Sequence, residues 1–106
     1  PPGGAFLVAS ADGEPLACGC VKVVSPGVGS IKRMWVAPAM RGLGFGRRIL
    51  EALESEARAL GLGTLRLETN RALVEARRLY ERAGYVEVAP FNDDPYADHW
   101  FEKRLE

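Results

Sequence analysis

The sequence predicts an α/β fold, a mixed sheet with two helices, in a single domain spanning residues 1–106. Short runs rich in valine, leucine and aromatic residues alternate with glycine- and proline-containing turns, which is typical of strands. Two longer segments repeat apolar residues at the spacing of an amphipathic helix. The elements follow in the order βββ-α-β-α-ββ. Because one strand lies on each side of the first helix, we expect those two strands to be parallel neighbours with a right-handed crossover.

Turn residues set the boundaries of these elements. Asp12-Gly13 is a hairpin signal between the first two strands, and Pro26-Gly27 with Gly29 is expected to form the next turn. Gly61 and Gly84 end the helices, since glycine is favoured just after a helix C-terminus. The predicted strands are Ala5–Ser10, Leu16–Val24, Ile31–Val36, Thr64–Thr69, Tyr85–Val88 and His99–Leu105, and the predicted helices are Leu43–Leu60 and Leu73–Ala83.

Composition excludes several classes of partner. The 14 basic and 14 acidic residues cancel, which argues against nucleic acid or an anionic membrane as the main partner. No apolar run is as long as a membrane span, and the first residues do not resemble a signal peptide, so we expect a cytoplasmic protein. Cys18, Cys20 and the single histidine, His99, cannot supply the four ligands of a structural zinc site. We expect no metal and two buried free thiols.

The most informative segment runs from the end of the third predicted strand into the first helix. Its three alternating glycines, Gly42, Gly44 and Gly46, open the helix. The first N–H groups of a helix have no intrahelical partners, and the helix dipole is positive there, so this end favours a phosphate. Arg41 and Arg47 add positive charge on either side. The segment therefore predicts binding of a phosphorylated cofactor, while its spacing fits neither a P-loop nor a complete dinucleotide-binding fingerprint.

Two motifs carry a family resemblance. Arg41-x-x-Gly44-x-Gly46 resembles the pyrophosphate-binding motif of the GNAT superfamily of N-acetyltransferases. The segment Ala76–Tyr85 is similar to the later motif of that family, Ala-x-x-Leu-Tyr-x-x-x-Gly-Phe/Tyr. The family often has an asparagine seven residues before the tyrosine, where this chain has Leu73. Asn70 lies three residues earlier, and we expect it to cap the following helix.

The resemblance implies a GNAT-like acyl-CoA N-acyltransferase fold and a direct transfer of acetyl from acetyl-CoA to a primary amine of a small molecule or protein. Acetyl-CoA (coenzyme A) would be the co-substrate. In the family, the strand before the glycine loop contacts the pantetheine arm through its backbone. The residues that the resemblance assigns to the cofactor are Met34, Trp35, Val36, Arg41, Gly42, Leu43, Gly44, Phe45, Gly46 and Arg47.

Two residues are candidates for proton transfer. The resemblance assigns Tyr80 as the general acid for the leaving thiolate, and a phenol is protonated at neutral pH. A core tyrosine is the alternative, because its spacing fits a buried helix face. Glu68 at a strand end is the candidate base; it is otherwise a solvated charge or a partner of Arg66 or Arg71. His99 is a weaker candidate, since the sequence shows no partner for it.

Two further functions stay open on the sequence alone. One is a non-catalytic acyl-CoA-binding regulatory or interaction domain of a longer protein, and the other, more distant, is a nucleotide-binding oxidoreductase domain. The chain begins Pro1-Pro2-Gly3-Gly4, and its first strand matches the second strand of the family. We therefore expect an N-terminally incomplete domain, or a homodimer in which segments such as His99–Leu105 cover the unpaired sheet edge.

Overall fold

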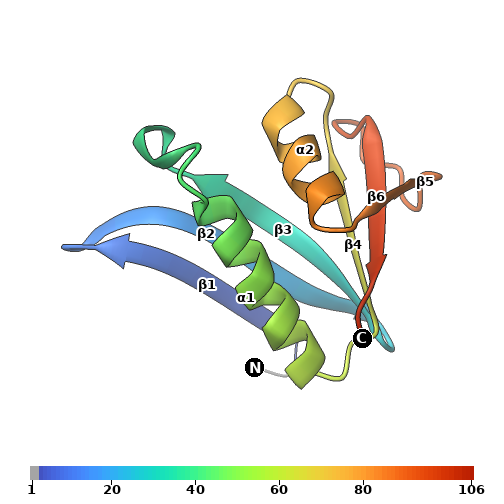
Figure 1. Ribbon diagram of the computed structural model, residues 1–106. Helices are drawn as coiled ribbons and strands as arrows, with labels where there is room; N and C mark the ends of the chain where they lie inside the picture. Colours follow the sequence, from blue (N-terminus) through green and yellow to red (C-terminus); the bar gives the residue numbers. More distant parts are fainter. Residues whose placement is uncertain (1–2) are drawn as a thin grey trace.

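The computed structural model describes residues 3–106 and confirms the mixed α/β sheet. Its strands are ordered β1-β2-β3-β4-β6-β5, with β3 and β4 parallel and the other neighbours antiparallel. Figure 1 shows the two helices lying on one face of this sheet, α1 over β1–β3 and α2 beside β4 and β6. The strands are β1 (Gly4–Ala11), β2 (Glu14–Ser25), β3 (Val28–Val36), β4 (Thr64–Thr69), β5 (Val86–Val88) and β6 (His99–Arg104), and the helices are α1 (Phe45–Ala59) and α2 (Val74–Arg82), with a 3-10 turn at Pro38–Met40 before α1.

The core lies between the helices and the sheet. Leu50 and Leu53 are fully buried on the inner side of α1, as the apolar spacing of that helix predicts. Leu65 and Phe101 meet the helices from β4 and β6, and both are at most 1% exposed. Tyr80 of α2 packs against Phe101 with ring centroids 6.3 Å apart. One apolar cluster therefore holds both helices on the same face of the sheet.

A buried polar cluster joins α1 to the end of the chain. The Tyr85 hydroxyl donates to Oε2 of Glu54 at 2.8 Å. The ammonium of Lys103 on β6 donates to both oxygens of the same carboxylate, at 3.1 and 3.3 Å, and to the Ala83 carbonyl at 2.7 Å. Burial, and then the hydrogen bond to Glu54, raises the pKa of Tyr85, so its hydroxyl stays a donor. The charge of Glu54 is thus paired and hydrogen-bonded, as a buried carboxylate requires.

The other face of the sheet has no helix over it in the described chain. Because side chains alternate along a strand, Leu7 and Val21 point to the helices while their neighbours point away. On that outer face Phe6 is 57% exposed, Val8 52% and Trp35 41%. β1 also pairs only with β2, so it is an edge strand. An exposed apolar face beside a free edge is typical of a surface that another segment or chain covers.

Two predictions about small residues were wrong for the same reason of side-chain alternation. Cys18 and Cys20 are free but only half-buried, because they lie on the outer face of β2 while the core positions go to their neighbours. Gly29 lies inside β3 rather than in the turn before it. A Cβ atom at Gly29 would be 2.8 Å from Leu62 and 2.9 Å from Leu65, so a larger residue at this core-facing position would displace those side chains.

The helices begin and end close to the predicted residues, with one cap misplaced. Asn70 is not the N-cap of α2; Leu73 occupies that position and no side chain caps the helix. The Oδ1 atom of Asn70 instead accepts the N–H of Ala72 at 3.0 Å, which makes a tight turn ahead of the helix. Neither helix within residues 3–106 is long and apolar enough to cross a membrane.

Candidate active site

The parallel strands β3 and β4 separate partway along their length. Their pairing ends at Ser30 with Arg66. Farther along β3 the register with β2 shifts, so that Arg33 and Met34 both lie opposite Gly19, and Arg33 has a φ of 57°. Such a β-bulge bends the strand that carries it. A groove of about 1360 Å³ occupies the region between the separated strands and the adjoining ends of the helices.

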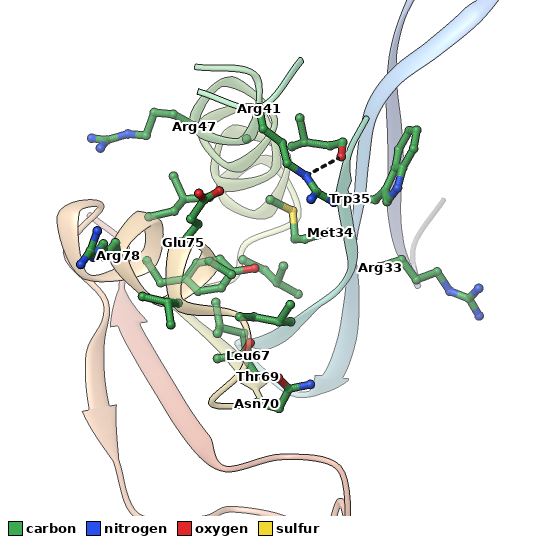
Figure 2. A pocket seen from close by; sticks show the side chains of 18 of the residues that line it. Arg33, Met34, Trp35, Arg41, Arg47, Leu67, Thr69, Asn70, Glu75 and Arg78 are labelled. Atoms are coloured by element: carbon green, nitrogen blue, oxygen red, sulfur yellow. Dashed lines mark hydrogen bonds between the residues drawn. The ribbon is translucent and has the colours of Figure 1, made fainter. Parts of the chain in front are cut away.

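The N-terminus of α1 opens onto this groove. Gly44, the N-cap, has a φ of 86°, a conformation that favours glycine, and no side chain caps the helix. The first N–H groups of α1 are therefore available to an anion, which the helix dipole also favours. A Cβ atom at Gly46 would be 3.2 Å from Leu79 of α2, so glycine lets the two helices approach closely. Arg41 Nε donates to the Val36 carbonyl at 3.3 Å, which holds this arginine at the groove (Figure 2).

The structure brings nearly all the sequence-assigned cofactor residues to the groove. Leu43 is the exception, since it is 64% exposed and does not line it. Trp35 borders the groove, but its side chain lies on the other side of β3 (Figure 2), so any contact would come from its backbone. The residues that line the groove from this set are Met34, Trp35, Val36, Arg41, Gly42, Gly44, Phe45, Gly46 and Arg47.

Tyr80 is both a core residue and a groove residue. Its ring is 5% exposed and packs edge-on against Tyr85, with centroids 5.9 Å apart. It also lines the groove from α2. Burial raises the pKa of Tyr80 to about 12, because the phenolate is poorly solvated there. Tyr80 therefore stays protonated at neutral pH, as a proton donor must be.

Glu68 is a buried carboxylate rather than a solvated one. Its side chain is 7% exposed, and the ammonium of Lys32 on β3 donates to its Oε1 atom. The partners suggested by the sequence were wrong, because Arg66 and Arg71 bind other carboxylates. Glu68 is one of the groove residues, and its second oxygen is buried and accepts no hydrogen bond from the described residues. The neighbouring Thr69 hydroxyl is buried and unsatisfied in the same way.

His99, the weaker candidate base, and Asp98 lie outside the groove lining. His99 has a partner after all, since its Nδ1 atom is 2.7 Å from Oε2 of Glu87, and it does not line the groove. Asp98 accepts the backbone N–H of Arg71 at 2.9 Å, and this hydrogen bond lowers the pKa of that carboxyl group. No cluster of three or more His, Cys, Asp or Glu residues suited to a metal occurs in the described part of the chain.

Further residues line the groove from the two central strands and from the final loop. Lys32 and Thr69 line it beside Glu68, and Asp94 and Tyr96 reach it from the loop before β6. Lys32 is opposite Glu68 only in the register that the structure shows, when the pairing of Ser30 with Arg66 is continued by two residues. The predicted strand bounds do not reveal this match. From the sequence, Asp94 is one of three final-loop carboxylates, with Asp93 and Asp98, that either face a cationic acceptor or stay solvated in a turn. Tyr96 had no assigned role, since the path of a long loop depends on tertiary contacts.

The fold and groove define an α/β protein with a split sheet and, at the split, a helix N-terminus that no side chain caps. A sequence model of the "Acetyltransferase (GNAT) family" matches residues 1–85. The chain is 42% identical over 92 residues to an IAA acetyltransferase of Azospirillum brasilense, covering 86% of this chain and 59% of that protein. It is 35% identical over 98 residues to an uncharacterized N-acetyltransferase of Schizosaccharomyces pombe, covering 90% and 60%. The chain belongs to the GNAT family of acetyltransferases, and it spans about three-fifths of the length of these relatives.

Solved structures agree on the fold. A protein of Klebsiella pneumoniae classed as an acyl-CoA N-acyltransferase superposes with a TM-score of 0.87 at 37% identity, over 100% of this chain and 76% of that one. The yncA protein of Salmonella typhimurium, solved with its cofactor acetyl-CoA, superposes with a TM-score of 0.82 at 20% identity, over 99% and 66%. The expected GNAT-like acyl-CoA N-acyltransferase fold is thereby confirmed.

Proposed function

We propose that this chain forms the coenzyme A-binding part of an N-acetyltransferase, which moves an acetyl group directly from acetyl-CoA to a primary amine. The observation that carries the proposal is the split between β3 and β4, which joins the uncapped N-terminus of α1 to a buried carboxylate within one groove. The groove is larger than the roughly 300–1000 Å³ of a typical small-molecule site, so it suits two substrates together. Family membership supports the same activity.

The cofactor half of the groove fits a pyrophosphate with an extended arm. The free N–H groups at the start of α1 suit the phosphates, and Arg41 and Arg47 place positive charge beside them. Beyond its pairing with β4, the β3 segment Met34–Val36 has backbone groups facing the split that are available to the amides of a pantetheine arm. This chemistry requires a ligand that is both a phosphate ester and an amide, as coenzyme A is.

The reacting groups would meet where the strands diverge. Acetyl-CoA, when bound, supplies an activated thioester, so no covalent protein nucleophile is required. Glu68 would take the proton of the amine, directly or through water, as the nitrogen bonds to the acetyl carbon. Tyr80 would give its hydroxyl proton to the sulfur as the carbon–sulfur bond breaks. Alignment of the two substrates supplies much of the rate enhancement.

Two variants of Gly44 test the cofactor site. Asp and Asn side chains have almost the same size, and both are forced into the φ of 86° that favours glycine. Only Gly44→Asp adds a charge facing the phosphates; two like charges about 5 Å apart at an effective dielectric of about 20 repel by about 3 kcal/mol. Calorimetry with acetyl-CoA should therefore show at least about a hundredfold weaker binding for Gly44→Asp than for Gly44→Asn. Equal affinities in two folded variants would overturn this site.

Thiol release from acetyl-CoA with a panel of primary amines tests the transfer itself. Release that depends on the amine supports the enzyme. Tight acetyl-CoA binding without release from any amine would instead support the non-catalytic acyl-CoA-binding domain.

The exposed side chains of Phe6, Val8 and Trp35 support the proposal that a second copy of the chain, or a further segment of the native chain, covers the outer face of the sheet. Light scattering of the purified protein distinguishes a dimer from a monomer. The free thiols of Cys18 and Cys20 support a reducing compartment such as the cytoplasm.

A further inference from the structure

Two buried polar atoms lack hydrogen bonds at one end of the groove. They are Oε2 of Glu68 and Oγ1 of Thr69 on β4, whose side chains point to opposite faces of the sheet, and nothing within residues 3–106 satisfies either atom. Figure 2 shows Thr69 at the opposite end of the groove from Arg41 and Arg47. Buried polar groups in folded proteins almost always have partners. The Glu68 oxygen, on the same face of the sheet as Lys32, therefore indicates where a polar ligand other than the cofactor phosphates binds.

A second cavity, of about 400 Å³, shares Lys32 with the groove. Its lining contains two basic residues, Lys32 and Arg66, two serine hydroxyls and no acidic residue. The guanidinium of Arg66 lies 5.1 Å from the centre of the Phe91 ring and donates to Glu102, which fixes its orientation. Lys32 gives one N–H to Glu68 and, like Arg66, retains further donors. Such a lining favours an anionic group.

We infer that the amine acceptor is a small molecule that also carries an anionic group such as a carboxylate. The inference rests on the proposed function, because it assigns the acceptor of the same groove. The amine N–H binds Oε2 of Glu68, and the anion binds Lys32 and Arg66 in the second cavity. Lys32 contacts the Glu68 carboxylate that binds the amine, and it also contacts the anion. It therefore determines specificity for an acceptor that carries both charges.

Pairs of acceptors that differ in one charge test this inference. The acids are glycine, β-alanine and 4-aminobutyrate, and each is compared with its own amide by thiol release from acetyl-CoA. A hydrogen bond to a charged group predicts a preference of about 10–100-fold in kcat/KM for at least one acid over its amide. Lys32→Gln should reduce that ratio to near one, and Lys32→Arg should keep most of it. Because an amide also changes amine basicity, the change between wild type and variant carries the test.

A matched control and a binding readout separate the outcomes. Lys22 is exposed on β2 and lines neither cavity, so Lys22→Gln should keep the wild-type ratio. Calorimetry of the three acids against protein saturated with coenzyme A measures binding without reaction, and thermal melting confirms that each variant folds.

Release without a preference for any acid, or a preference that a folded Lys32→Gln variant retains, would overturn the inference and leave the acetyl transfer standing. Acid binding that is lost in Lys32→Gln, without release from any amine, would support the anion site and overturn the proposed function. Neither binding nor release would overturn both.

Discussion

Replacing Lys103 with methionine should strongly destabilise the fold. Met keeps the apolar stem but removes the ammonium that donates to both oxygens of Glu54 and to the Ala83 carbonyl. The Glu54 side chain is 7% exposed and would keep only the hydrogen bond from Tyr85. Removing one partner of a buried ion pair costs about 3–5 kcal/mol. Because Lys103 itself is 23% exposed, solvent screening reduces our expected loss to about 2–3 kcal/mol.

Urea denaturation at pH 7, followed by circular dichroism, measures this loss. In a domain of this size it corresponds to a fall in Tm of roughly 10–20 °C. Glu54→Gln and the double variant complete a mutant cycle, and we expect a coupling energy of about 2 kcal/mol between the two positions. Lys22→Met, on an exposed position, is the control and should change stability by no more than about 0.5 kcal/mol. A Lys103→Met loss as small as the control, or additive single variants, would refute the reasoning.

Three further predictions concern the groove. Tyr80→Phe should lower kcat by about 10²–10⁴ with little change in acetyl-CoA affinity, and an unchanged kcat at saturating substrate would leave Tyr80 as packing alone. Because burial raises the pKa of Tyr80 to about 12, its phenol stays protonated well above neutral pH. Deprotonation of Tyr80 should therefore not lower kcat between about pH 7 and 10, and the pH profiles of wild type and Tyr80→Phe should have the same shape in that range. Gly19→Ala would place a Cβ 2.5 Å from the Met34 sulfur, so it should lower the free energy of unfolding by about 1–3 kcal/mol and weaken acetyl-CoA binding. Gly13→Ala, in the open β1–β2 turn, is the control and should leave acetyl-CoA binding unchanged.

The features that could be predicted from sequence are those set by local chemistry. One such feature is the N-terminus of α1, which Gly44 and Gly46 open and which points into the groove. It could be predicted because glycine conformation and the helix dipole act within a few residues. The parallel pairing of β3 with β4 followed from the handedness of strand–helix–strand units. Tyr80 lies on a buried helix face and also lines the groove, so its position is compatible with both interpretations of the sequence, a core tyrosine and a general acid.

The features that could not be predicted depend on pairing between distant segments. The bulge at Arg33 exists only relative to the register of β2, and it requires the missing side chain of Gly19. Lys32 is the partner of Glu68, although Arg66 lies on the same face of β4 as Glu68, because Glu102 lies directly opposite Arg66 on β6 and binds its guanidinium. Arg71 is bound to Asp98. The partial exposure of Cys18 depends on the face of the sheet to which its side chain points.

The short ladder between β3 and β4 divides the molecule into two halves. One half contains β1–β3 with α1, and the other contains β4–β6 with α2; their strands are paired only from Val28–Ser30. On the helix side, the bonds from Tyr85 and Lys103 to Glu54 cross from the second half to the first. This cluster therefore acts as a clamp between the halves on the helix side, at the level of the ladder, because Lys103 pairs with Leu65, which pairs with Gly29. A substitution in the clamp, well away from any bound ligand, should alter acetyl-CoA affinity along with stability.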